Sequence, residues 1–166
     1  MRHHVHDRLL LAAWAGLFAV LGLAICSPAH AEERDKKDVT LWYEAFNKND
    51  PTLLDRILSE EWVDIPAAPG QSPGPEGAKR ILAELTTAFP DLKISIKEIL
   101  QDGNKVTVRS EISGIQKDAL MGFPAKNRQM AIQAIDIHEF KDGKILRTWH
   151  TEDWLTGLHQ LGVLEK

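Results

Sequence analysis

The stretch from Ile135 to Asp153 constrains the fold of this chain more than any other segment. Two runs of alternating residues flank Asp142-Gly143, a dipeptide that favours the tight turn of a β-hairpin. Because successive side chains of a strand point to opposite faces, Asp136, His138 and Phe140 would share one face of the first strand. A hairpin with several acids and histidines is typical of a pocket wall. An enzyme or a small-ligand binder is therefore the leading interpretation.

Three more side chains with functional potential lie at the end of the second strand: Trp149, His150 and Asp153. Because Trp149 and His150 are adjacent, a regular strand points them to opposite faces. Only one of the two would then line the pocket, unless a bulge intervenes. Asp153 directly precedes a predicted helix, where aspartate is a favoured N-cap.

The first 31 residues have the features of a secretory signal peptide. Arg2 and Arg8 give a basic start, residues 9–25 are apolar, and Ala29-His30-Ala31 offers small residues at both positions that a signal peptidase recognises. We therefore predict cleavage after Ala31 and a secreted or periplasmic protein. An uncleaved signal that anchors the chain is the alternative, and it would be the protein's only contact with a membrane.

The mature chain, residues 32–166, would hold 18 basic and 23 acidic side chains, a formal charge of −5. Its length suits one domain with one core. An acidic chain without a basic run is a poor nucleic-acid binder. The only cysteine, Cys26, would leave with the signal peptide. The three remaining histidines lack the spacing of a zinc site, so no metal is expected.

Helical spacing of apolar residues dominates the first half of the mature chain. It predicts one helix over residues 39–47, a second that starts at Pro51, and a third over residues 76–89. Residues 61–65 would be a short extended piece. Residues 66–75 hold four prolines and two glycines and would form a loop. Residues 32–38 are a charged lead-in that we expect to be mobile.

Alternating residues dominate the second half. They predict four strands and a short closing helix, over residues 92–100, 106–113, 128–140, 144–150 and 154–161. Helices followed by an antiparallel meander make an α+β fold. Such a sheet, covered by helices on one face, can curl into a half-open cone whose mouth holds a ligand.

Six short motifs span nearly the whole mature chain. They are Trp42-Tyr43-Glu44-Ala45-Phe46, Gly74-Pro75-Glu76-Gly77, Ala88-Phe89-Pro90-Asp91-Leu92, Gly122-Phe123-Pro124-Ala125, Asp142-Gly143-Lys144-Ile145 with Trp149, and Gln160-Leu161-Gly162. Each is short, but their order and spacing resemble the SnoaL-like polyketide cyclases, or ester cyclases, of the nuclear-transport-factor-two-like superfamily. The resemblance implies a cone-like curved antiparallel sheet, a half-open barrel, with three to four helices enclosing a pocket.

The resemblance also implies an activity, which is ring closure of a polyketide ester by intramolecular aldol condensation without metal or organic cofactor. Asp153 stands at the position of the family's general acid/base. Asp136 and His138 match a pair of polar residues on the preceding strand, although Asp136 replaces what is often an amide. Ile65 stands where many relatives have a histidine. The outer face of the sheet often pairs two copies in this superfamily, so a homodimer is a further expectation.

The polar candidates have plausible chemical roles. An aldol closure needs a base beside a carbonyl and an acid for the new alkoxide, and one carboxyl such as Asp153 can serve as both if apolar surroundings raise its pKa. His138 could polarise the substrate carbonyl. Asp136 could orient His138 or bind a substrate hydroxyl, and His150 is a further candidate. The competing interpretation for each is a hydrogen-bonded structural side chain.

Aromatic side chains could stack on a flat substrate. The substrate-binding candidates are Trp149, Trp154, Tyr43, Phe46, Trp62 and Phe123. Aromatic residues at helical spacing are more commonly core, which is the alternative for those in the first helix.

Three functions remain open from the sequence. The first is a cofactor-independent, polyketide-cyclase-like enzyme that acts on a small carbonyl or ester compound by aldol-type acid/base chemistry. The second is a non-catalytic periplasmic binder of a small apolar ligand. The third is a hydrolase or dehydratase that uses an Asp/His pair to activate water. A superfamily fold does not choose among them.

Overall fold

The computed structural model describes residues 28–165. The predicted signal peptide falls almost entirely outside these residues, and its cleavage stays a prediction. The elements in chain order are α1 (Pro28–Asp38), α2 (Thr40–Lys48), α3 (Thr52–Ile57), β1 (Leu58–Ile65), α4 (Pro75–Ala88), β2 (Lys93–Asp102), β3 (Lys105–Ile115), β4 (Gln129–Lys141), β5 (Lys144–Glu152) and α5 (Trp154–Gln160).

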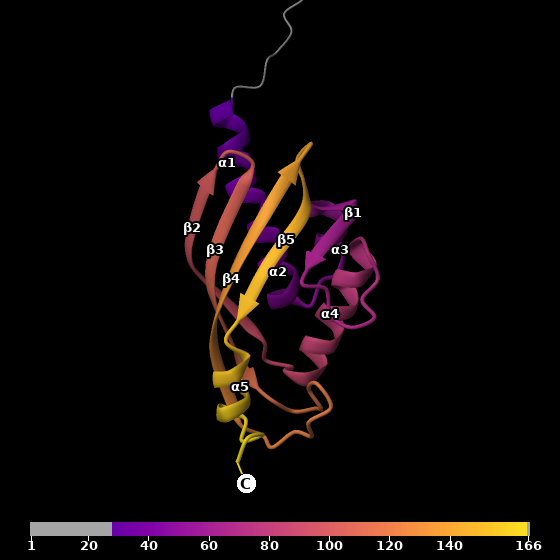
Figure 1. Cartoon of the computed structure of the whole chain (residues 1–166), viewed down its shortest axis with the longest axis vertical. Coiled ribbons are helices and arrows are strands. Elements are labelled where there is room, and N and C mark those ends of the chain that lie inside the picture. The colour runs from indigo at the N-terminus through magenta and orange to yellow at the C-terminus, as the bar shows by residue number, and fades with distance from the viewer. Residues whose placement is uncertain (1–27, 166) are drawn as a thin grey trace, which may run out of the picture.

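The five strands form one curved, unclosed sheet in the order β1-β5-β4-β3-β2 (Figure 1). Strands β2 to β5 are an antiparallel meander, as predicted, and the hairpin turns at Asp142-Gly143. The earlier strand β1 joins the edge and runs parallel to β5. The predicted α+β class with a half-open, helix-covered sheet is therefore confirmed, with one parallel pair added.

Side chains of β3 and β4 alternate regularly between the two faces of the sheet. On β4 the even-numbered residues from Met130 to Phe140 are buried and face the helices. The register places Asp136 opposite His150 of β5, and places Ala134 between Glu152 of β5 and Ser110 of β3. These two neighbouring rows form the centre of the concave face.

A β-bulge in β5 interrupts the hairpin's alternation. Phe140 pairs with Ile145, but the next residue of β4, Glu139, pairs with Arg147, so Leu146 is the extra residue. A bulge of one residue exchanges the faces of all the side chains that follow it. Ile145 and His150 therefore both face inward although their numbers differ in parity, and Trp149 faces outward.

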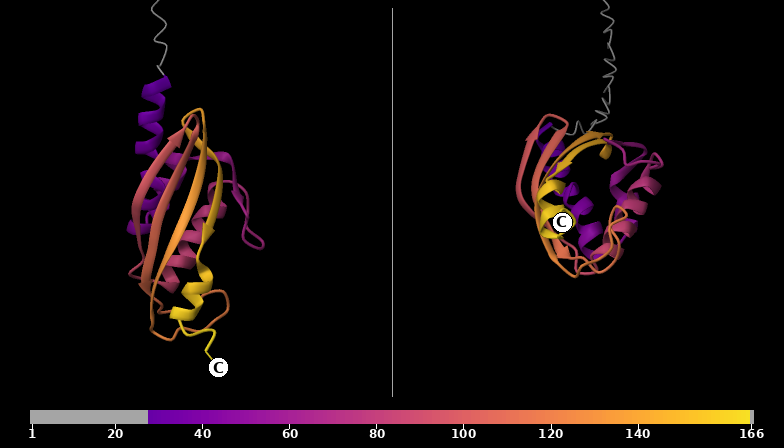
Figure 2. Two further views of the ribbon diagram at one scale, coloured as in Figure 1. Left: turned by 60° about the vertical axis from the view of Figure 1, so that its left-hand side comes forward. Right: turned by 60° about the horizontal axis from the view of Figure 1, so that its bottom comes forward.

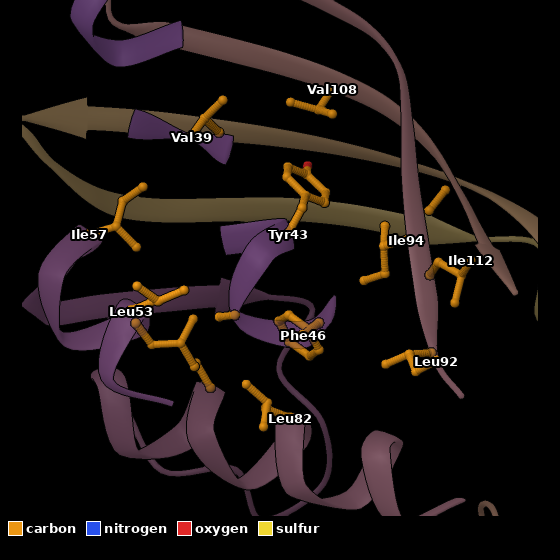
Figure 3. Packing of buried hydrophobic residues seen from close by; sticks show 14 of the residues in the cluster. Val39, Tyr43, Phe46, Leu53, Ile57, Leu82, Leu92, Ile94, Val108 and Ile112 are labelled. Carbon is orange, nitrogen blue, oxygen red and sulfur yellow. The ribbon is translucent and has the colours of Figure 1, made fainter. Parts of the chain in front are cut away.

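The helices cover the concave face of the sheet. Figure 2 shows α2 within the curve and α4 closing the side next to β1, so that the sheet wraps around them. The core lies between these layers, with Tyr43 and Phe46 of α2, Leu82 of α4 and Ile94 and Ile112 of the sheet drawn in Figure 3. The three helices predicted in the first half of the mature chain correspond to α2, α3 and α4 and are confirmed to within a few residues.

The expectation of a mobile lead-in at residues 32–38 is wrong, because these residues belong to α1. The Val39 amide at its end donates to the Asp35 carbonyl at 2.9 Å, and the Asp35 side chain is buried. Within residues 28–165, no helix has the length and apolar character needed to cross a membrane.

Candidate active site

A small cavity lies between α2 and the concave face of the sheet. Its volume is about 80 Å³, and we call it the inner cavity. Residues from α2, α4 and all five strands line it: Trp42, Tyr43, Phe46, Asp64, Ile81, Leu85, Ile94, Ser110, Ile112, Ala134, Asp136, Thr148, His150 and Glu152. The lining is apolar at the β2–β3 end and polar at the β5 end.

Asp136 is a buried carboxyl of the inner cavity. The residue is 7 % exposed, and the Tyr43 hydroxyl donates to its Oδ2 at 2.7 Å. Burial raises the pKa of Asp136 to about 6, although the Tyr43 hydrogen bond acts in the opposite direction. A carboxyl with this pKa exchanges protons readily near neutral pH.

A chain of hydrogen bonds extends from Asp136 into the core. Tyr43 Oη also lies 3.1 Å from Nε2 of His138, and Nδ1 of His138 lies 3.0 Å from Oγ1 of Thr148. The Trp62 indole N–H donates to the same Thr148 oxygen at 3.0 Å. Burial lowers the pKa of His138 to about 3, so this histidine is neutral at physiological pH.

The direction of every bond in this chain follows from its two ends. An ionised Asp136 only accepts, so Tyr43 donates to it and must accept from the Nε2–H of His138. Nδ1 of a neutral His138 then accepts from the Thr148 hydroxyl, which accepts from Trp62 in turn. Each donor has one acceptor, so the network holds Tyr43 and Asp136 in fixed orientations.

His150 lies opposite Asp136 and is held on both ring nitrogens. Nδ1 contacts Glu152 Oε1 at 2.9 Å, and Nε2 contacts the Pro66 carbonyl at 2.9 Å and Asp64 Oδ1 at 3.4 Å. The hydrogen bond to Glu152 is the largest cause that raises the pKa of His150, to about 9. His150 is therefore positively charged at neutral pH. Among residues 28–165, no group of three or more His, Cys, Asp or Glu side chains is arranged to hold a metal ion.

A larger open groove continues outward from the inner cavity. It has a volume of about 1060 Å³ and shares Ile81, Leu85, His150 and Glu152 with the inner cavity. Its other walls are α4, residues 68–69, residues 118–122 and Trp154. We call this larger space the outer groove. His150 and Glu152 line both spaces and therefore stand at the entrance from the outer groove to the inner cavity.

Asp153, which the resemblance implies to be the acid/base, lines neither the inner cavity nor the outer groove. Its side chain is exposed and accepts from the Thr156 amide at 3.1 Å as the N-cap of α5. Hydrogen bonding to Thr156, with its side chain as the larger cause and its backbone amide as the second, lowers the pKa of Asp153. The apolar surroundings expected to raise that pKa are therefore not found, because the cap position faces solvent.

The aromatic candidates divide into three groups. Tyr43 and Phe46 line the inner cavity, and Trp154 lines the outer groove. Trp62 is fully buried and belongs to the core. Trp149 and Phe123 line neither space.

Trp149 and Phe123 lie elsewhere for identifiable reasons. The bulge in β5 turns Trp149 to the outer face of the sheet, where the Lys105 amine lies 5.1 Å from the centre of its ring. Phe123 is 40 % exposed in the loop between β3 and β4.

Sequence reasoning missed several residues of the inner cavity as site candidates. Thr148 and Glu152 share a face with His150, and the period of two along β5 could have identified them. Asp64 comes from β1, whose pairing with β5 was not predicted. Ser110 lies on a strand that was predicted, but its sequence context gave no functional signal.

Comparison with known proteins agrees with this architecture. TsrD from Streptomyces laurentii shares 27 % identity with a TM-score of 0.75, over 80 % of this chain and 97 % of TsrD. IdmH from Streptomyces antibioticus, provisionally assigned as a polyketide cyclase, shares 26 % identity with a TM-score of 0.68, over 77 % of this chain and 98 % of IdmH.

A Bacillus cereus protein with the same provisional assignment shares 29 % identity with a TM-score of 0.65, over 82 % of this chain and 80 % of its own. A comparison with curated proteins gave no match. The model of the SnoaL-like polyketide cyclases matches residues 37–161, which include every residue of the inner cavity. This chain therefore belongs to the SnoaL-like polyketide cyclase family.

Proposed function

We propose that the protein is a cofactor-independent acid/base enzyme that deprotonates a carbon next to a carbonyl group in a small carbonyl or ester compound. The observation that carries the proposal is the pairing of Asp136 with His150 across β4 and β5. Their surroundings raise both pKa values, that of Asp136 to about 6 and that of His150 to about 9. At neutral pH this pair offers a base beside a positive charge.

The chemistry follows from these two charges. Ionised Asp136 takes the proton of the carbon acid. The electron pair of the C–H bond forms the carbon–carbon double bond of the enolate, and the π pair of the carbonyl group moves to its oxygen. The positive charge of His150 stabilises the resulting enolate. The enolate carbon then bonds to a second carbonyl carbon of the same molecule, and protonated Asp136 returns its proton to the new alkoxide. The net reaction is ring closure without loss or gain of atoms.

The remaining polar residues would act on this pair. Tyr43 and His138 orient the Asp136 carboxyl through the hydrogen-bond chain. Glu152 and Asp64 maintain the charge of His150. Asp153, at the family's acid/base position, is assigned here to capping α5.

The first half-reaction can be tested before the natural substrate is known. Phenylacetone dissolved in D₂O exchanges the hydrogens next to its carbonyl, and NMR follows the exchange. We expect the mature protein to accelerate it. Asp136→Asn should reduce this acceleration by about 100-fold or more, the usual contribution of a general base.

Asp153→Asn is the matched control. It removes one carboxyl charge from the same region and should retain most of the acceleration. The opposite pattern, in which Asp153→Asn loses the acceleration and Asp136→Asn retains it, would contradict the proposal. Asp153 would then be the acid/base, as the family resemblance implies. Binding of the ketone without exchange in any variant would indicate a binding protein.

A further inference from the structure

Ser110 of β3 carries a buried hydroxyl that the rest of the described structure does not engage. The residue is 1 % exposed and lines the inner cavity. Its Oγ has no hydrogen-bond partner among residues 28–165. Burial of a hydroxyl without a partner is destabilising, so the fold alone does not account for a serine at this place.

The position of Ser110 relative to Asp136 is set by the strand register. Ser110 is the direct partner of Ala134 on β4, and Asp136 is the next inward residue of that strand. Ser110 and Asp136 are thus diagonal neighbours on one face, a relation in which Cα atoms lie roughly 7–8 Å apart. Ala134, the direct partner of Ser110 and the inward neighbour of Asp136 on β4, has a small side chain that leaves room for part of a ligand.

The surroundings of Ser110 are apolar. Its neighbours along the wall of the inner cavity are Ile94, Ile112 and Ala134. In an apolar environment a single hydrogen-bonding group discriminates strongly, because a ligand that lacks the matching atom leaves that group unpaired.

We propose that the Ser110 hydroxyl binds a second oxygen of the substrate, a hydroxyl or carbonyl oxygen about one ring's width from the carbon that Asp136 deprotonates. This inference rests on the proposed function, since it takes Asp136 as the base. It names the substrate class as carbonyl compounds with two oxygens at this separation. The reacting carbon sits beside Asp136, and the second oxygen sits over Ala134.

Three ketones test the proposal: phenylacetone and its two derivatives that carry a hydroxyl group at position 3 or position 4 of the ring. Their affinities for the wild-type protein and for Ser110→Ala are measured by NMR titration. We expect one hydroxylated isomer to bind the wild type about 3- to 10-fold more tightly than phenylacetone, the usual effect of one neutral hydrogen bond. This advantage should vanish in Ser110→Ala, while phenylacetone itself binds both proteins equally.

Thermal unfolding of the same variants separates this role from a structural one. Ser110→Ala removes an unpaired buried hydroxyl and should raise the melting temperature while it lowers selectivity. Ser113→Ala, on the opposite face of β3, is the matched control and should leave the affinity ratio unchanged. The proposal is overturned if a hydroxyl group gives no gain in affinity for the wild type, or if the gain survives in Ser110→Ala.

Hydrogen exchange of phenylacetone in these samples distinguishes the two proposals. Phenylacetone lacks the second oxygen, so its exchange depends on Asp136 and not on Ser110. Exchange without any hydroxyl effect would overturn the role of Ser110 alone. A Ser110-dependent hydroxyl effect without exchange would overturn the acid/base function alone.

Discussion

Asp136 and His150 are direct partners across two strands, yet opposite causes determine their protonation. Burial penalises the charge of Asp136 and raises its pKa. Hydrogen bonding to Glu152 favours the charge of His150 and raises its pKa to about 9. Between these two pKa values the carboxylate and the imidazolium are both charged, which is the state that the proposed reaction needs.

The first prediction is the pH dependence of that reaction. The rate of phenylacetone exchange should rise as Asp136 ionises near pH 6 and fall as His150 loses its proton near pH 9. His150→Gln should remove the alkaline limb, because glutamine does not titrate. A rate that is flat from pH 5 to about pH 10 would exclude both residues from the rate-limiting step.

The hydrogen bond from Tyr43 to Asp136 leads to a second prediction. Its hydrogen bond lowers the pKa of Asp136, so Tyr43→Phe should raise that pKa above about 6 and shift the acid limb of the profile upward. Thr148→Val is the control, since it breaks the same hydrogen-bond chain at a point without contact to Asp136. A larger shift in Thr148→Val than in Tyr43→Phe would contradict the assignment of the Tyr43 hydrogen bond as the one that lowers the pKa of Asp136.

At the scale of elements, the bulge in β5 decides which side chains enter the inner cavity. The alternation of the hairpin was evident from the sequence, and so was the expectation that only one of Trp149 and His150 would face the pocket, but the sequence did not show which one. The extra residue at Leu146 was not, because no turn-forming or glycine residue marks it. A one-residue insertion depends on packing of the two strands against the helices, which local sequence does not encode.

The contact between α4 and the preceding loop yields a third prediction. Gly77 lies in the first turn of α4, and a Cβ there would collide with the backbone oxygen of Ser72. The loop at 66–74 also supplies the Pro66 carbonyl that contacts His150. Alanine normally stabilises a helix relative to glycine. Here Gly77→Ala should instead destabilise the protein by about 1–3 kcal/mol through the clash.

Chemical denaturation measures this effect, and the exchange rate measures its consequence at His150. Ala83→Gly, in the same helix at an exposed position, provides the reference for an ordinary change in helix propensity. If Gly77→Ala were more stable than the wild type, the close approach of α4 and the loop would be wrong.

At the scale of the whole molecule, periodicity predicted more of the fold than of the site. The helices and strands follow local patterns, and the Asp142-Gly143 turn indicated where the two strands of the hairpin are joined. The pairing of β1 with β5 joins residues far apart in the chain and had no local signal, so Asp64 was missed. Asp153 was favoured by family position, whereas burial, a property of the assembled layers, distinguishes Asp136.

The fourth prediction concerns the pH dependence of stability, which Asp136 and His150 should both influence. The pKa of Asp136 is raised in the folded protein, so its contribution to stability is lost as pH rises from about 4 to about 6. The raised pKa of His150 stabilises the fold below pH 6.5, and this contribution is lost as pH rises to about 9. Thermal unfolding should therefore show a melting temperature that falls between pH 6.5 and about 9. An equal fall in His150→Gln would contradict the linkage.

NMR titration of the Asp136 side-chain carbon shows whether this carboxyl is the base of the proposed pair. We expect a step near pH 6 for Asp136 that moves upward in Tyr43→Phe, together with a step for Asp153 below its usual value. If Asp136 titrates at or below ~3.9, the ordinary value for an aspartate, it is not the buried base of this site. The proposed acid/base pair would then be wrong.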